Sequence, residues 1–193
     1  MNTIKLVFAT HNKNKFKEIQ ALVPDHIELL SLEEIGCEED IEETGDTIDA
    51  NAIIKAEYVR SRYGYDCFAD DTGLEVESLA GAPGVYSARY AGEIKDDSAN
   101  RRKLLNQLEE RNDRTARFKT VIALNLKENE NLFTGICEGS ITREERGVNG
   151  FGYDPIFQPK GFDKTFAEMN LEEKSGISHR AKAFKELIDY LSI

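Results

Sequence analysis

The sequence predicts an α/β fold with a mixed β-sheet, because helical and strand-like patterns interleave along the chain and two long strand-like segments form a hairpin. Apolar residues make up 40% of the 193 residues, which is enough for a core. A chain of this length buries roughly 70% of its extended surface on folding. Because no Pro-, Gly- or Ser-rich linker interrupts the sequence, residues 1–193 are expected to form one domain.

The first third of the chain is predicted to hold a strand and two helices. Residues 4–9, Ile-Lys-Leu-Val-Phe-Ala, are typical of a buried strand, and apolar residues at helical spacing over 16–23 predict the first helix. The same spacing over 50–59 predicts a second helix, which ends near Gly64, a residue favoured just beyond a helix C-terminus.

The middle of the chain is predicted to be less regular. Residues 67–69 are typical of a short buried strand, and Asp-Asp-Thr-Gly at 70–73 is a turn signal that should end it. The Gly- and Pro-containing stretch 78–92 is expected to be irregular. Loops of this length inside a compact domain are usually functional.

The rest of the chain should contain the hairpin and two more helices. A helix around 104–108 is expected to begin at a cap among residues 96–98, where Asp, Asp and Ser follow one another. Segments 115–127 and 132–142 are strand-like and form the hairpin. Apolar residues on one face of 181–191 predict a closing amphipathic helix.

Charge and composition exclude several classes of protein. The formal net charge of −11 makes a nucleic-acid polymer an unfavourable partner, because such binding depends on neutralising phosphates. No apolar run approaches the roughly 18 residues that a membrane span needs, and the N-terminus lacks the features of a signal peptide. Cys37, Cys67 and Cys137 are odd in number and widely spaced, which favours reduced thiols and a cytoplasmic location.

The first candidate site lies between the first strand and the first helix. The start of a helix presents backbone N–H groups and the positive end of its dipole, and both favour a phosphate. Lys13 and Lys15 would add charge, and Thr10, Asn12 and Asn14 would add neutral hydrogen bonds. The loop lacks the glycines of a Walker A motif. The alternative interpretation is an ordinary helix start with solvated lysines.

The second candidate site is a set of carboxylates. Asp70 and Asp71 should stand at the end of a buried strand, where α/β sheets place catalytic groups, and neighbours on a strand point to opposite faces. The segment 38–45 is strongly acidic, although most of it is expected to be solvated surface. Mg²⁺ typically uses only one or two carboxylates together with substrate phosphates and water, so one Glu and one Asp would suffice.

Two later segments offer ligand contacts. Glycines around the aromatic residues of 150–155 let a ring stand close to the backbone as a stacking face, or else the rings fill the core. Ser178 is expected to cap the last helix, which places His179 and Arg180 in its first turn, near Lys174 in the sequence. Cations there are unfavourable by roughly 0.3–1 kcal/mol, which suggests a role toward an acceptor-rich ligand; a solvated pair is the alternative.

Taken together, these segments resemble the inosine triphosphate pyrophosphatase family, whose members remove noncanonical purine nucleoside triphosphates from the nucleotide pool. Each block is short, but the blocks follow the family's order over nearly the whole chain. Thr72 stands where many relatives have Ser, and Ser175-Gly176 replaces a more usual polar pair. The matching blocks are 8–15, 43–45, 51–52, 69–74, 81–92, 150–157, 165–169, 173–174 and 177–180.

The resemblance implies a fold and an activity. The fold would be an elongated mixed sheet with two α/β lobes flanking an active-site cleft, within one domain. The activity would be Mg²⁺-dependent hydrolysis of ITP, dITP or XTP to the monophosphate and pyrophosphate. The family is usually homodimeric, and the loop 81–92 is a reasonable contributor to the cleft or the interface.

The resemblance also assigns roles to residues. Asp71 would accept a proton from the attacking water, and Glu43, preferred over Glu42, would hold Mg²⁺ with Asp71. Thr72 would hydrogen-bond the nucleotide, and Arg180 would donate to the 6-keto oxygen that distinguishes these purines from adenine. Guanine shares that oxygen, so its rejection must depend on the 2-position. The phosphate contacts would be Thr10, His11, Asn12, Lys13, Asn14 and Lys15, and the base and sugar contacts Phe151, Gly152, Tyr153, Asp154, Lys174, His179 and Arg180.

Two other functions compete with this one. A related pyrophosphatase of the septum-inhibitor type would act on pyrimidine triphosphates, and the segments 151–154 and 179–180 argue against it. A catalytically silent nucleotide-binding module would use the same phosphate contacts for sensing. The presence of each acidic residue needed for Mg²⁺ argues against that alternative.

Overall fold

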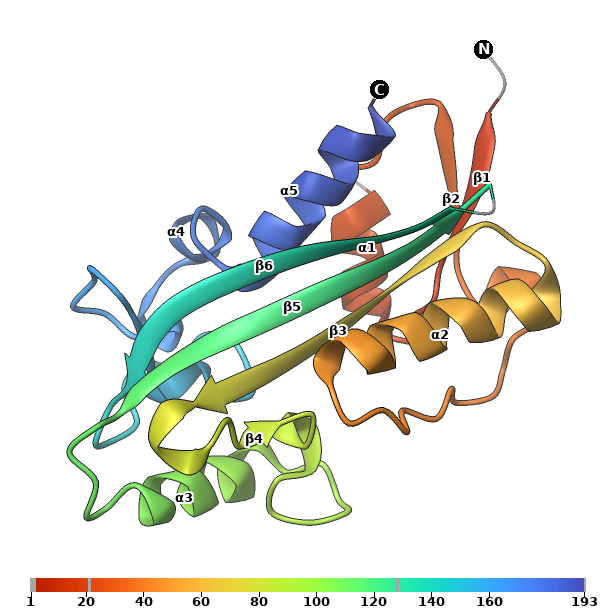
Figure 1. Ribbon diagram of the computed structural model, residues 1–193. Coiled ribbons are helices and arrows are strands. Elements are labelled where there is room, and N and C mark those ends of the chain that lie inside the picture. Colours follow the sequence, from red (N-terminus) through yellow and green to blue (C-terminus); the bar gives the residue numbers. More distant parts are fainter. Residues whose placement is uncertain (1–2, 21, 128, 193) are drawn as a thin grey trace. The chain divides into compact units, whose positions relative to one another are not determined.

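The computed structural model describes residues 3–20, 22–127 and 129–192, and it confirms an α/β fold with a mixed sheet (Figure 1). Over these residues the sheet has seven strands in the order β2-β1-β3-β5-β6-β7, and β4 pairs with β3. The strands are β1 (Ile4–Phe8), β2 (Ile27–Leu30), β3 (Cys67–Val76), β4 (Pro83–Gly84), β5 (Thr115–Leu126), β6 (Asn129–Ile141) and β7 (Phe157–Pro159).

The strand pairing is both parallel and antiparallel. β1 runs parallel to β2 and to β3, with Val7 opposite Cys67 in the second pair. β4 runs antiparallel to β3, and β7 runs antiparallel to β6. Parallel neighbours need a crossover connection, which α1 (Lys13–Gln20) provides between β1 and β2. The next helix, α2 (Ile48–Tyr63), connects β2 to β3, which lies on the other side of β1. Because it contains both parallel and antiparallel pairs, the sheet is mixed, as predicted.

The predicted helices form, although the first begins at Lys13 and ends at Gln20, so Leu22 and Val23 lie beyond it. Gly64 ends α2 as expected, with a φ of 73°, and Thr47, which was not predicted, caps α2 by accepting a hydrogen bond from the backbone N–H of Ala50. Asp96 caps α3, and Ser178 Oγ accepts from the backbone N–H of Ala181 at the start of α5. The remaining bounds are α1 (Lys13–Gln20), α3 (Asp97–Gln107), α4 (Leu171–Ser175) and α5 (His179–Leu191). No helix in the described part of the chain is long and apolar enough to cross a membrane.

The chain divides into two compact units, each with its own core. The first comprises residues 1–71, 120–134 and 183–193, and the second comprises 72–119 and 135–182. In the first core the rings of Phe8 and Phe68 stack with centroids 4.5 Å apart. In the second core Phe118 packs edge-on against Phe157 at 4.6 Å. Strands β3, β5 and β6 each contribute residues to both units.

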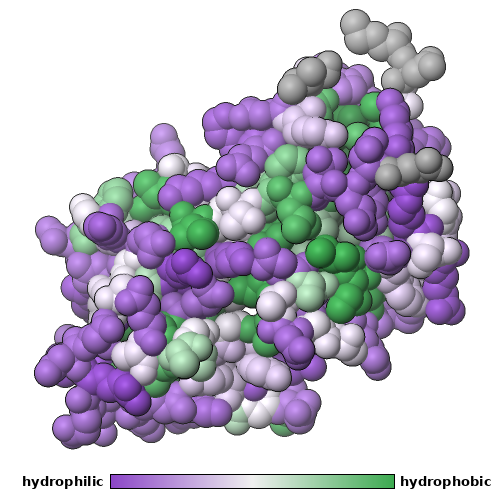
Figure 2. Space-filling model, viewed as in Figure 1, coloured by the Kyte–Doolittle hydropathy of each residue, from purple (hydrophilic) through white to green (hydrophobic). Residues whose placement is uncertain are grey.

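Polar side chains cover most of the face shown in Figure 2, and apolar residues gather there in small groups. This agrees with a chain in which 32% of residues are charged. Cys37, Cys67 and Cys137 are free and buried, which agrees with the expectation of unpaired thiols. Burial raises the pKa of the Cys67 thiol to about 12 and that of Cys137 to about 11, so these thiols stay protonated.

Three sequence predictions need correction. The turn expected at 70–73 is absent, because β3 continues from Cys67 to Val76. Its aspartates are paired with lysines from other elements, so tertiary contacts outweigh the local turn signal. The stretch 78–92 is not wholly irregular, because it contains β4 and a 3-10 turn at Ser87–Arg89. β6 begins at Asn129, three residues before the expected start of the second hairpin strand.

Candidate functional site

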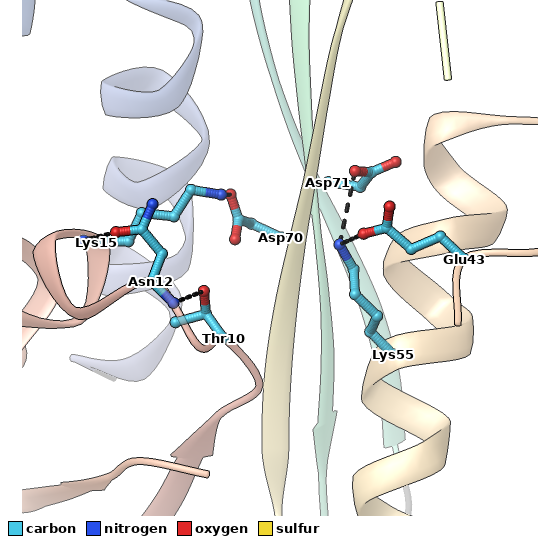
Figure 3. Close-up of polar contacts among 7 residues, drawn as sticks. All are labelled: Thr10, Asn12, Lys15, Glu43, Lys55, Asp70 and Asp71. Carbon is cyan, nitrogen blue, oxygen red and sulfur yellow. Dashed lines mark hydrogen bonds and ion pairs between the residues drawn. The ribbon is translucent and has the colours of Figure 1, made fainter. Parts of the chain in front are cut away.

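Asp70 and Asp71 point to opposite sides of β3 in the first unit, as alternation along a strand requires (Figure 3). Lys15 comes from α1 on one side, and its Nζ lies 2.7 Å from Asp70 Oδ2. Lys55 comes from α2 on the other side, and its Nζ lies 3.6 Å from Asp71 Oδ1. The structure confirms that the two aspartates face different surroundings, although they lie within a strand and not at its end.

The Asp70–Lys15 ion pair is largely removed from water. The Asp70 side chain is 2% exposed and the Lys15 side chain 23%. A carboxylate at this depth needs a partner, because an unpaired buried charge costs several kcal/mol. The pair therefore fixes the first turn of α1 against β3.

The predicted phosphate loop is shorter than the sequence suggested. Asn12 caps α1, because its Oδ1 accepts from the backbone N–H of Lys15 at 3.2 Å. Thr10 Oγ1 in turn accepts from the Asn12 N–H at 3.2 Å. Lys13 and Lys15 thus lie in the first helical turn, and not in a loop. His11 is exposed, with its Nε2 3.0 Å from the Glu39 carbonyl oxygen. The side chain of Asn14 lies outside the described part of the structure.

Lys55 joins the two predicted metal ligands. Its Nζ lies 2.5 Å from Glu43 Oε1 as well as near Asp71, so one ammonium group faces both carboxylates. Burial alone would lower the pKa of Lys55, but the carboxylates of Asp71, Asp70 and Glu43 outweigh it and the pKa is raised. The ammonium group therefore stays charged at neutral pH. Of the two glutamates left open by the sequence, Glu43 is the one that contacts Lys55.

The position of Glu43 depends on the start of α2. Gly45 donates its backbone N–H to Asn51 Oδ1 at 2.8 Å, and Asn51 is buried. A Cβ at Gly45 would stand 2.7 Å from the Ala50 Cβ, so a larger residue cannot take this path without a shift. The Glu-Thr-Gly sequence thus folds back against α2 and directs the Glu43 carboxylate toward Lys55.

Sequence reasoning missed Lys55, although a signal was present. The buried face of α2 includes Asn51, Ala52, Ala56 and Val59. Lys55 stands one turn from three of these residues, so it shares their face at a position where a charge needs a partner.

The donor set of this cluster suits Mg²⁺. Glu43 and Asp71 supply carboxylate oxygens, which Mg²⁺ prefers, and they already share one cation. Among the described residues no group of three or more His, Cys, Asp or Glu side chains could hold a metal. Two carboxylates leave most of an octahedral shell to phosphate oxygens and water, which is how Mg²⁺ is usually bound beside nucleotides.

The segment 150–154 in the second unit is organised around Asp154. This carboxylate is 3% exposed, and its Oδ2 accepts from the backbone N–H of Phe151 at 2.9 Å and from Lys174 Nζ at 2.5 Å. Gly150 has a φ of 75°, and a Cβ there would collide with the Asp154 carboxylate. Tyr153 is buried and donates its hydroxyl to the Ser87 carbonyl at 2.8 Å.

Phe151 is exposed and stands beside two cations. Phe151 is 61% exposed. Lys174 Nζ lies 5.3 Å from the centroid of its ring, and Arg180 Cζ lies 5.6 Å from the same centroid. The Nε of Arg180 is buried and donates to no acceptor in the part of the chain that the structure describes. This cluster offers a flat apolar face with hydrogen-bond donors near it, which suits a heteroaromatic base.

The remaining predicted residues are less accessible. His179 is 4% exposed, and its ring stacks on Phe118 with centroids 4.6 Å apart, so it is not a solvated residue. Thr72 is half-buried and follows Asp71 directly on β3. The predicted phosphate and metal residues thus lie in the first unit, and the predicted base and sugar residues lie in the second, with Thr72.

Known proteins resemble this chain over nearly its whole length. The model of the Ham1 family matches residues 6–190. A protein of Christiangramia forsetii named dITP/XTP pyrophosphatase is 75% identical over 189 residues, which cover 98% of this chain and 100% of that protein. A protein of Flavobacterium johnsoniae with the same name is 61% identical, over 98% of each chain. A HAM1 protein structure from Coxiella burnetii is 42% identical with a TM-score of 0.94, over 98% of this chain and 99% of that one.

Proposed function

The chain belongs to the Ham1 family, and we propose that it hydrolyses ITP, dITP and XTP to the monophosphate and pyrophosphate with Mg²⁺. Membership confirms the family resemblance that the sequence blocks predicted. The names of its relatives, dITP/XTP pyrophosphatase, support noncanonical purine nucleotides as the substrate class.

The observation that carries the proposal is the meeting of Glu43, Lys55 and Asp71. Two carboxylates from different elements converge on one cation, with distances of 2.5 and 3.6 Å from Lys55 Nζ. Glu43 and Asp71 would hold Mg²⁺, which neutralises charge on the phosphates when bound. An exposed acidic surface would not bury a lysine between its carboxylates, so this arrangement favours an active site over a solvated face.

Asp71 is proposed as the proton acceptor. It would take the proton from a water molecule as that water attacks the α-phosphorus, and pyrophosphate would leave with the electron pair of the broken P–O bond. Lys13 and Lys15, in the first turn of α1, would bind the negative charge of the phosphates together with the helix dipole. Thr10, His11, Asn12 and Asn14 are proposed to complete the phosphate contacts.

Base selection is proposed to depend on donors beside Phe151. The buried Nε of Arg180 would donate to the 6-keto oxygen of hypoxanthine or xanthine. Adenine presents an amino donor at this position, so the donor would remain unpaired, at a cost of about 1–3 kcal/mol. The base would stack on the Phe151 ring, and Lys174 would add a second cation close to it.

We also propose a cytoplasmic homodimer. The exposed apolar side chains Tyr86 and Ile94, 70% and 83% exposed, lie in and just after the loop predicted to contribute to an interface. Sedimentation at several protein concentrations tests the dimer. A mass of one chain at micromolar concentration would contradict it.

The function is tested by measuring pyrophosphate release from ITP, dITP, XTP, ATP, GTP and UTP side by side, with Mg²⁺ and with EDTA. We expect strong preference for the first three nucleotides and no release in EDTA. Preference for UTP would instead support the pyrimidine pyrophosphatase. Nucleotide binding without release from any substrate would support the silent binding module.

A further inference from the structure

Both backbone polar groups of Gly152 are bound by one turn of α3. Asp97 Oδ2 accepts from the Gly152 N–H at 2.8 Å, and Arg101 Nη1 donates to the Gly152 carbonyl oxygen at 2.8 Å. Asp97 and Arg101 are four residues apart, so they lie on the same face of the helix. We name this arrangement, formed by Asp97, Arg101 and Gly152, the Gly152 clamp.

The clamp fixes the two peptide planes on either side of Gly152. The N–H belongs to the peptide that joins Phe151 to Gly152, and the carbonyl belongs to the peptide that joins Gly152 to Tyr153. Gly152 has a φ of 60°, and a glycine restricts its own backbone least of all residues. The conformation at this point must therefore be imposed by contacts, and Asp97 and Arg101 provide them.

Arg101 is itself restricted. Its side chain is 14% exposed, and its Nε lies 3.0 Å from Glu145 Oε1 in an ion pair that lacks hydrogen-bond geometry. A half-buried guanidinium group that donates to a carbonyl from Nη1 and has a carboxylate beside Nε has little freedom left. Asn100, the preceding residue, is buried and ties α3 to the chain before it by accepting from the Ala91 N–H at 2.7 Å.

The orientation of Phe151 depends on this clamp. Its ring is exposed and is not held by core packing, whereas its own N–H is bound to Asp154 and the following peptide is bound to Asp97. The cationic groups of Lys174 and Arg180 lie beside this ring. A shift of the Phe151–Gly152 peptide would move the stacking face relative to these donors.

From these contacts we infer that Asp97 and Arg101 are positioning residues for base recognition, acting through Gly152. This inference rests on the proposed function, and it adds two residues of α3 that the family resemblance did not assign. The clamp should affect how tightly the base is bound and how well ITP is distinguished from ATP. It should leave the chemical step and the binding of phosphates unchanged.

The test compares Arg101→Met with Arg102→Met, a matched control that makes the same charge change at the exposed neighbouring residue of α3. Loss of a hydrogen bond from a charged group predicts about a tenfold rise in KM for ITP in Arg101→Met, with kcat within about twofold. The preference for ITP over ATP should narrow by a similar factor. Arg102→Met should match the wild type in each measurement.

A second pair of variants tests the other half of the clamp. Asp97→Ala removes the acceptor for the Gly152 N–H, whereas Asp97→Asn keeps an oxygen that can accept it. We expect Asp97→Ala to weaken IMP binding by about tenfold in calorimetry, without changing pyrophosphate binding, and Asp97→Asn to restore most of the IMP affinity. A merely structural role would lower both affinities together.

The two hypotheses fail in different ways. If wild-type protein releases no pyrophosphate from ITP, the proposed function is wrong and the inference falls with it. Suppose instead that the wild type is active, that Arg101→Met and Arg102→Met have the same KM for ITP, and that Asp97→Ala and Asp97→Asn bind IMP equally well. The proposed function then stands, and the clamp has no role in base recognition. Equal losses of IMP and pyrophosphate binding in Asp97→Ala would also overturn the inference.

Discussion

Asp70 and Asp71 are neighbours in sequence, yet each pairs with a lysine from a different helix. Asp70 is paired with Lys15 of α1, and Asp71 faces Lys55 of α2. Two adjacent carboxylates can stand within one strand because a separate lysine pairs with each of them. Asp71 is proposed to act in catalysis and Asp70 to hold α1 to β3, so we predict a loss of turnover for a change at Asp71 and a loss of stability for a change at Asp70.

Asp71→Asn should keep the fold and remove most turnover. The amide cannot accept the proton from water, and loss of a general base typically costs 10²–10⁴-fold in rate. Lys55 retains its 2.5 Å contact with Glu43, so the unfolding temperature should change little. Turnover of ITP, measured together with the thermal unfolding curve, checks both statements. Unchanged turnover would remove Asp71 from the mechanism.

Asp70→Asn should instead lower stability. The substitution leaves the partly buried Lys15 ammonium group without its counter-charge, and breaking such a pair costs about 3 kcal/mol or more. The free energy of unfolding in urea is the relevant measurement. If that free energy stays within about 0.5 kcal/mol of the wild type, the pair does not hold α1 to β3 as described.

Arg180→Ala should narrow the preference for ITP over ATP. The variant loses a donor to the 6-keto oxygen, which weakens transition-state binding of ITP by about 1–3 kcal/mol, or roughly five- to 150-fold in kcat/KM. ATP should lose much less, because adenine offers no acceptor at the 6-position. Equal losses for both nucleotides would show that Arg180 does not read the base.

Local sequence patterns predicted α1, α2, α3 and α5 and the strands β1, β5 and β6, because the signals of these elements are local. The short elements β2, β4, β7 and α4 were not predicted. Thr47, Gly64 and Asp96 end or begin helices through contacts within one turn. The turn predicted at 70–73 was wrong because the partners of its aspartates come from other elements, α1 and α2, and no local rule contains them.

The segment that leads to Glu43 is held to α2 through Glu39. Tyr58 donates its hydroxyl to Glu39 Oε1 at 2.6 Å, and Tyr63 donates to the same oxygen at 3.0 Å. The hydrogen bond from Tyr58 is the largest cause that lowers the pKa of Glu39, to about 2. Arg62 adds a cation 3.5 Å away. The ionised carboxylate therefore stabilises this segment.

Acid should weaken this attachment in a defined range of pH. Because the folded pKa of Glu39 is depressed, its contribution is fully present above the ordinary value of 4.5 and is lost as pH falls toward about 2. Unfolding free energies of wild type and Glu39→Gln, measured from pH 6 to pH 2, should therefore converge at low pH. Parallel curves across that range would contradict the assigned role of Glu39.

At the scale of the whole molecule, composition predicted the broad class and motifs predicted the candidate residues. The family and the mixed α/β fold are confirmed. Lys55 was missed although its place on the buried face of α2 was a local signal. The Gly152 clamp was not predicted, because it depends on contacts between segments far apart in sequence. Arg101 and Gly152, for example, are 51 residues apart.

The central claim is the cleavage of ITP between its α- and β-phosphates in the presence of Mg²⁺. The most direct test is ³¹P NMR of ITP incubated with the wild-type protein and Mg²⁺, with EDTA as the control. Equal amounts of IMP and pyrophosphate, formed only with Mg²⁺, are the predicted result. IDP and inorganic phosphate, or unchanged ITP, would contradict the proposed reaction.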